Sequence, residues 1–161
     1  MKNNLGVKTF VLSTLFSIFA CPICAGGNIS NAKTVEIKVK SVKINGYVGG
    51  RIDDCINHRV MEEDVDALVE PFRHRTETWR WQSEFWGKWT LGAIETYRYT
   101  GDAALYEKIA ASVGHIIETQ SSDGYIGNYA PEAQLKDWDI WGRKYTMLGL
   151  LSWYELSGDT R

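Results

Sequence analysis

The sequence contains no block of lysine and arginine residues that could neutralise a phosphate backbone. Its 18 basic and 20 acidic residues give a formal net charge of −2 over 161 residues. Because binding to nucleic acid depends on clustered positive charge, nucleic acid is not an expected partner. The hydrophobic fraction of 44% and the charged fraction of 24% are those of an ordinary globular protein, so a disordered chain is not indicated either.

Cysteine and histidine are scarce, with three residues of each. The histidines lack the spacing of metal ligands, so the sequence predicts no metal site in this chain. Cys21 and Cys24 form a Cys-Pro-Ile-Cys motif, but this motif lies inside the targeting segment described next, where a redox or metal-binding role has no meaning. Cys55 is then the remaining cysteine, and we expect a small buried side chain rather than a reactive thiol.

The N-terminal apolar run is too short to span a bilayer comfortably. Residues 9–20 are uncharged and mostly apolar, follow a basic start and precede small residues near Ala25. This order is typical of a secretory signal peptide, so we expect cleavage after residues 1–25 and a periplasmic or extracellular protein. A lipoprotein signal with lipid on Cys21 is the alternative, although Phe19 is bulky where a small residue is usual. Neither interpretation includes a membrane span.

Residues 26–50 are predicted to form a polar leader and a short β segment. Apolar residues alternate with polar ones over residues 35–44, with one slip, and a period of two is typical of a half-exposed strand. The Asn-Gly pair at 45–46 is a turn signal, and the glycine pair at 49–50 is expected to break the chain.

From residue 51 onward the apolar residues recur at helical spacing. A short apolar stripe is expected to end at Pro71. Three longer helices are expected over residues 83–99, 102–120 and 142–156, and the second of them has the pattern of an amphipathic helix.

An internal repeat relates the first and third of these helices. An offset of 57 residues maps Gly92 onto Gly149 and the corner Gly101–Asp102 onto Gly158–Asp159. The unit is a helix hairpin, in which a glycine inside the first helix would be compensated by close helix packing. Apolar inner helices and amphipathic outer helices describe a closed α/α toroid or an α-solenoid. We therefore expect a mainly α fold, with residues 51–161 as the truncated N-terminal part of a toroid.

Tryptophan is the enriched residue type, with seven copies that all lie from Trp79 onward. Four fall within residues 79–89, at the start of the first long helix, and two more lie at the equivalent start of the third. Loops that lead into one end of a set of inner helices meet at a common mouth, where tryptophan and charged groups suit a sugar ring. Trp81 and Trp141 are expected to face this mouth, whereas Trp86 is equally compatible with the core.

A turn at Asp123–Tyr125 is the second notable segment. Gly124 permits a positive φ, and Tyr125 either points into the cavity or seals the loop. No two carboxylates can be assigned as a general acid and a nucleophile from spacing alone, so catalytic residues are expected beyond Arg161. The candidate substrate-binding residues are Trp81, Glu84, Trp86, Asp123, Tyr125, Trp141, Arg143 and Lys144.

Four ordered segments carry a family resemblance. They are Gly87-Lys88-Trp89-Thr90-Leu91-Gly92, Thr100-Gly101-Asp102, Asp123-Gly124-Tyr125-Ile126 and Trp141-Gly142-Arg143-Lys144-Tyr145. The set resembles the N-terminal part of the β-L-arabinofuranosidase family, glycoside hydrolase family 127 and its relatives, over about residues 50–161. The resemblance implies a bacterial secreted glycoside hydrolase with an (α/α)6 toroid that acts on an oligo- or polysaccharide. It also implies a zinc-held cysteine nucleophile in the full-length protein, downstream of this chain.

One departure from the family concerns the sugar. Arabinofuranosidases carry a His-Glu pair just before the tyrosine that matches Tyr145, where this sequence has Arg143 and Lys144. Because arginine pairs bidentately with carboxylates, we predict an acidic sugar, or one other than plain arabinofuranose. Two alternatives stay open: a polysaccharide lyase or unsaturated-uronyl hydrolase on the same toroid, and a non-catalytic helical-repeat binding module.

Overall fold

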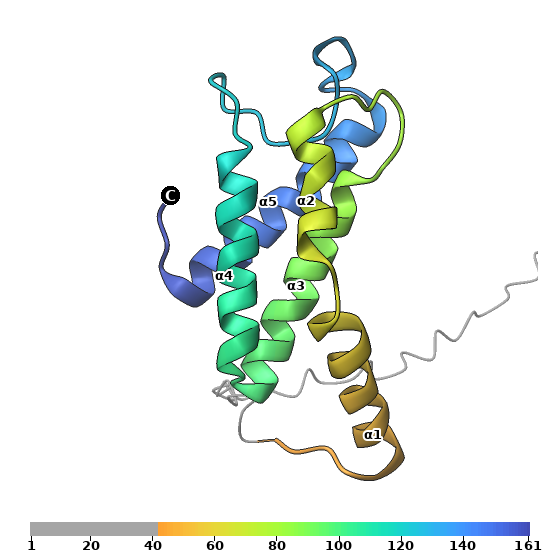
Figure 1. Ribbon diagram of the computed structural model, residues 1–161, viewed down its shortest axis with the longest axis vertical. Coiled ribbons are helices and arrows are strands. Elements are labelled where there is room, and N and C mark those ends of the chain that lie inside the picture. Colours follow the sequence, from red (N-terminus) through yellow and green to blue (C-terminus); the bar gives the residue numbers. More distant parts are fainter. Residues whose placement is uncertain (1–41) are drawn as a thin grey trace, which may run out of the picture. The chain divides into compact units, whose positions relative to one another are not determined.

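The computed structural model describes residues 42–161, and every regular element within them is helical (Figure 1). The elements are α1 (Gly46–Cys55), the π-helix η2 (Ile56–Met61), α2 (Val65–His74), α3 (Ser83–Thr100), α4 (Ala103–Glu118), the 3-10 helix η3 (Pro131–Ala133) and α5 (Asp137–Ser157). The prediction of a mainly α fold is confirmed for this part of the chain. In residues 42–161, no helix has both the length and the apolar character needed to cross a membrane.

The start of the described region differs from the prediction. Residues 42–45 form no strand, and α1 begins at Gly46 and runs through the glycine pair that was expected to break the chain. A local cause is visible at Gly49, which is buried against the backbone carbonyl of Ile44 just before α1, where a Cβ atom would overlap that carbonyl. Cys55 is exposed rather than buried. The remaining β segment, the leader and the predicted signal peptide lie outside the described residues.

The helix α2 continues through Pro71, so the proline does not end the apolar stripe as predicted. Val69 and Phe72, on either side of it, are fully buried, and their burial offsets the backbone hydrogen bond that proline cannot donate. The helix closes at Arg75, a left-handed residue with φ of 50°, whose N–H donates to the Pro71 carbonyl at 3.1 Å.

The corner between α3 and α4 is formed as predicted. Gly101 ends α3 in the left-handed conformation with φ of 70°, which glycine adopts without steric cost. Asp102 then caps α4, because its carboxylate accepts hydrogen bonds from the backbone N–H groups of Ala104 and Leu105 at 2.8 and 3.2 Å. Gly158 ends α5 in the same way with φ of 76°, so the repeat predicted from the sequence has the same helix termination in both copies.

Helices α3 and α5 make the most extensive contact between elements of the described region (Figure 1). Gly87 lies against the backbone of Tyr145, and a Cβ atom at Gly87 would overlap the Tyr145 carbonyl. Gly149 packs on the ring of Trp86. The close packing predicted for the repeated glycines is therefore found at Gly149, but Gly92 faces open space, and Gly87 makes the close approach from α3.

The core lies among α2, α3, α4 and α5. Helix α4 is amphipathic as predicted, and Leu105, Ile109, Val113 and Ile116 on its inner face are fully buried. The fully or almost fully buried cluster consists of Val69, Phe72, Trp86, Ala93, Ile94, Leu105, Ile109, Val113, Ile116 and Trp153. This core fixes the positions of α3 and α5, whose N-terminal ends form the site described below.

Replacing Gly87 by alanine is expected to lower the free energy of unfolding by about 1–3 kcal/mol, the usual cost of overpacking. Gly92→Ala is the matched control, because it places the same methyl group in the same helix in open space. Helix propensity alone should then raise the stability of the control by roughly 1 kcal/mol. Urea unfolding followed by circular dichroism measures both variants, and equal effects would contradict the close contact between α3 and α5.

Candidate functional site

The N-terminal ends of α3 and α5 bring together four tryptophans, Trp79, Trp81, Trp138 and Trp141, which we call the aromatic cluster. The ring centroid of Trp138 lies 5.7 Å from that of Trp81 and 6.0 Å from that of Trp141. Trp79, Trp138 and Trp141 line an open groove of about 490 Å³ together with Asp137. The four side chains are 39–61% exposed, so their rings are accessible to a ligand.

Trp86, a candidate from the sequence, does not belong to this cluster. It is fully buried, and its indole N–H donates to the Ser112 hydroxyl at 2.8 Å. Trp81 and Trp141 do lie in the cluster, as the sequence predicts for residues at the mouth. Three further members of this site, Trp79, Trp138 and Asp137, were not among the candidates predicted from the sequence. Their positions at the starts of the two helices were sufficient to predict them.

Glu84 is the buried charge beneath the aromatic cluster, with 6% of its surface exposed. Its carboxylate accepts a hydrogen bond from the indole N–H of Trp141 and pairs with the Lys88 ammonium at 2.8 Å. The hydrogen bond that Lys88 donates to Glu84 also raises the pKa of Lys88. Because hydrogen bonds to ionised groups are strong, Glu84 holds the Trp141 ring in one orientation.

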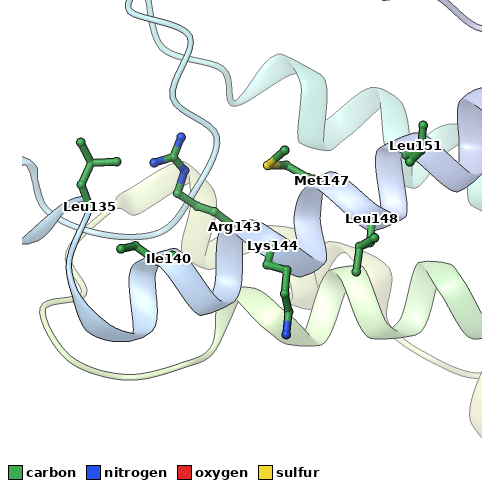
Figure 2. Close-up of a pocket in the computed structure, with 7 residues that line it drawn as sticks. All are labelled: Leu135, Ile140, Arg143, Lys144, Met147, Leu148 and Leu151. Atoms are coloured by element: carbon green, nitrogen blue, oxygen red, sulfur yellow. The ribbon is translucent and has the colours of Figure 1, made fainter.

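Arg143 and Lys144 are neighbours in α5 but point apart (Figure 2). The Lys144 ammonium lies 3.5 Å from the centroid of the Trp141 ring, a cation–π contact. The Arg143 guanidinium lies 5.2 Å from the centroid of the Tyr125 ring instead. Successive residues of an α-helix are about 100° apart around its axis, so the two cations do not converge as a pair. Lys144 alone joins the aromatic cluster.

Tyr125 seals the loop that follows α4. Its hydroxyl donates to the buried Asp139 carboxylate at 2.7 Å and accepts the Tyr129 N–H at 3.1 Å. Asp139 also accepts the Leu135 N–H at 2.6 Å, which ties the preceding loop to the first turn of α5, and this helix begins at Asp137 rather than near Gly142 as predicted. Burial first, and then the hydrogen bond to Asp139, raise the pKa of Tyr125 far above its usual value. Tyr125 therefore links the loop to α5 as a neutral phenol.

Asp123 stabilises the same loop and lies outside the aromatic cluster. Its carboxylate accepts hydrogen bonds from the Ser121 hydroxyl and, at 3.2 Å, from the Tyr125 N–H. The Ser121 contact, and then the Tyr125 contact, lower the pKa of Asp123. With Gly124 at φ of 86°, these bonds define a turn. Of the eight candidates, the structure thus gathers four at the cluster, namely Trp81, Glu84, Trp141 and Lys144.

A second surface, on α5, is apolar (Figure 2). It forms a hollow of about 630 Å³ lined by Leu135, Ile140, Arg143, Lys144, Met147, Leu148 and Leu151. Met147 is 68% exposed and Leu151 is 52% exposed, so no other described part of the chain covers this face. Apart from the two cations it offers few hydrogen-bonding groups. Such a surface suits packing against protein better than recognition of a sugar.

Comparison with known proteins gives no family assignment. No protein family, curated protein or solved structure matches this chain. Within residues 42–161 there is also no group of three or more histidine, cysteine or acidic side chains placed to hold a metal ion. The function is therefore argued from the geometry of the aromatic cluster.

The buried tyrosines predict a loss of stability at alkaline pH. Tyrosine in an unfolded chain has a pKa of about 10, whereas burial, followed by the charge of Glu77, raises the pKa of Tyr129 to about 12, and that of Tyr125 is higher still. Above pH 10, in round terms, the unfolded state therefore binds fewer protons than the native state, and the free energy of unfolding falls as the pH rises.

Urea unfolding from neutral pH to about pH 12 measures this decline. Tyr125→Phe should flatten it, because one of the tyrosines that the native state keeps protonated is gone. Tyr154→Phe is the control, since Tyr154 is 51% exposed. The same slope in the Tyr125 variant as in the wild type would contradict the assignment.

Proposed function

We propose that this chain is the N-terminal part of a secreted glycoside hydrolase built on an (α/α)6 toroid, and that its aromatic cluster binds an oligo- or polysaccharide. The observation that carries the proposal is the exposed cluster itself, in which Glu84 fixes Trp141 in place and Trp138 lies between Trp81 and Trp141. The family resemblance assigns catalysis, and zinc in the full-length protein, to residues outside this chain.

The chemistry of the groove supports a sugar as the ligand. A sugar ring has apolar C–H faces that stack on indole rings, and hydroxyl groups that bond to carboxylates. The groove offers Trp79, Trp138 and Trp141 for stacking, and Asp137 for hydroxyl groups. Because Glu84 and the neighbouring rings already hold Trp141, little side-chain freedom is lost on binding.

The arrangement of the helices supports the toroid. Successive contacts pair early residues of α3 with early residues of α5, such as Glu84 with Trp141 and Gly87 with Tyr145, so the two helices run in the same direction. Helix α4 lies between them in the chain and packs on α3, as the outer helix of a hairpin would. In a toroid, the exposed apolar face of α5 is the face that a following hairpin covers. The same face favours the second candidate function, a non-catalytic binding module.

The charges near the cluster support an acidic sugar. Lys144 lies over Trp141, whereas Lys88 is already paired with Glu84. A sugar stacked on Trp141 would place its carboxylate near the Lys144 ammonium, which contacts the same ring. This role falls to Lys144 rather than to an arginine–lysine pair, since Arg143 contacts Tyr125.

Trp138→Ala is expected to weaken binding of oligogalacturonides to the purified protein about tenfold, because stacking on one aromatic ring contributes about 0.5–1.5 kcal/mol beyond the apolar area it buries. Isothermal titration calorimetry measures the affinity, and quenching of tryptophan fluorescence is an independent readout. Tyr154→Ala, which removes an exposed aromatic ring elsewhere on α5, is the matched control. Unchanged affinity in the Trp138 variant would overturn the assignment of the cluster.

Lys144→Ala tests the preference for an acidic sugar. Loss of a charged hydrogen-bond donor should weaken binding of oligogalacturonides about tenfold and leave neutral arabino-oligosaccharides unchanged. Lys136→Ala is the control, because Lys136 is an exposed lysine that bonds only to a backbone carbonyl in the structure. Equal losses for acidic and neutral oligosaccharides would argue against the acidic sugar, while leaving the aromatic cluster as the binding surface.

A further inference from the structure

Asn128 is a buried residue whose side-chain amide has no hydrogen-bond partner within residues 42–161. Its backbone carbonyl accepts the Glu77 N–H at 3.1 Å, which fixes it beside the segment that joins α2 to α3. Both the amide oxygen and the amide nitrogen are unpaired. Buried polar groups are nearly always hydrogen-bonded, because leaving one unpaired costs free energy. The fold alone gives no reason for an asparagine here.

Asn128 is one of the residues that line a pocket of about 400 Å³, which we call the Asn128 pocket, and its amide lies buried at the edge of this pocket. Ala67 and Pro71 of α2 contribute an apolar wall, while Thr76 and Gln82 contribute polar groups. The pocket therefore combines a small apolar surface with several groups that both donate and accept hydrogen bonds. Because Asn128 has no exposed surface, a ligand that reaches its amide displaces a lining side chain that covers it.

The charge of the pocket disfavours an anionic ligand. Glu70 and Glu77 both line it. Hydrogen bonds from Arg73 first, and then from His74, lower the pKa of Glu70. The pKa of Glu77 is also lowered, although burial opposes this, because three successive backbone N–H groups donate to its carboxylate at 2.8–3.0 Å. Both carboxylates are therefore negative at neutral pH. The charge of Glu70 is matched by Arg73 at 2.7 Å, so Glu77 supplies most of the repulsion against an anion.

We infer that the Asn128 pocket binds a neutral sugar residue, with two adjacent hydroxyl groups bonded to the Asn128 amide. One hydroxyl accepts from the amide N–H and the other donates to the amide oxygen, so a vicinal diol satisfies both unpaired atoms. The C–H face of the ring packs on Ala67 and Pro71. The inference rests on the proposed function for the class of ligand, but on different residues from those of the aromatic cluster.

The pocket and the aromatic cluster are connected through Glu77. This side chain lines the pocket and also accepts the backbone N–H of Trp79, one of the four rings of the cluster. A glycan bound at the cluster thus has a second subsite along the same chain segment. The two subsites differ in charge: Lys144 favours an acidic sugar at the cluster, whereas Glu70 and Glu77 favour a neutral one in the pocket.

The side-chain NH₂ signals of Asn128 in ¹⁵N-resolved nuclear magnetic resonance spectra report on the pocket directly. Asn128→Leu identifies these signals by their loss. Titration of the purified protein with D-galactose should shift them, whereas D-galacturonate, its carboxylated counterpart, should not. Ala67→Phe fills the pocket and should abolish the shift, while Ala111→Phe, the same change at an exposed alanine of α4, should preserve it. Trp138→Ala should also preserve it, which separates the pocket from the cluster.

Thermal unfolding supplies a second readout. Asn128→Leu should raise the melting temperature, because it removes an unpaired buried amide while keeping a side chain of similar size. Two results would overturn the inference and indicate that only an ordered water bonds to the amide. One is that the Asn128 signals stay unchanged at saturating D-galactose. The other is that Asn128→Leu lowers the melting temperature without affecting sugar binding. The test of the aromatic cluster, loss of oligogalacturonide binding in Trp138→Ala, is independent of both readouts on the Asn128 pocket.

Discussion

The close approach of α3 and α5 is the constraint on which the rest of the structure depends. Gly87 brings the backbones of the two helices into contact, and Gly149 fits against the buried ring of Trp86. Since both helices run in the same direction, this contact places their first turns together. The tryptophans before and within those turns then form one cluster, and Glu84 is within reach of Trp141. A larger side chain at Gly87 would separate the elements that build the site.

The parts of the fold that local signals determine were predictable from the sequence. The corner at Gly101 and Asp102 is an example, because a left-handed glycine and an aspartate cap act within a few residues. The parts that distant contacts determine were not. The sequence gives no sign that Tyr125 donates a hydrogen bond to Asp139 in the first turn of α5, 14 residues further along the chain.

The candidate site was predictable in its position but not in its composition. Tryptophans before two helices of a repeat pointed to a shared mouth, and Trp81 and Trp141 lie there. The separation of Arg143 from Lys144 follows from their adjacency in α5, but which of the two faces the cluster depends on how α5 is rotated against α3, which residue spacing does not specify. The sequence did not indicate a role for Asn128, because whether a buried amide has a hydrogen-bond partner depends on the residues that surround it in the folded structure.

The bond between Glu84 and Trp141 joins residues 57 positions apart, which is the offset of the repeat itself. The same repeat position therefore holds a hydrogen-bond acceptor in one copy and its donor in the next. Two identical copies would set carboxylate against carboxylate or indole against indole, so this contact requires the two copies to differ at that position. Among homologous sequences, positions 84 and 141 should accordingly change as a pair, and neither copy of the helix can replace the other.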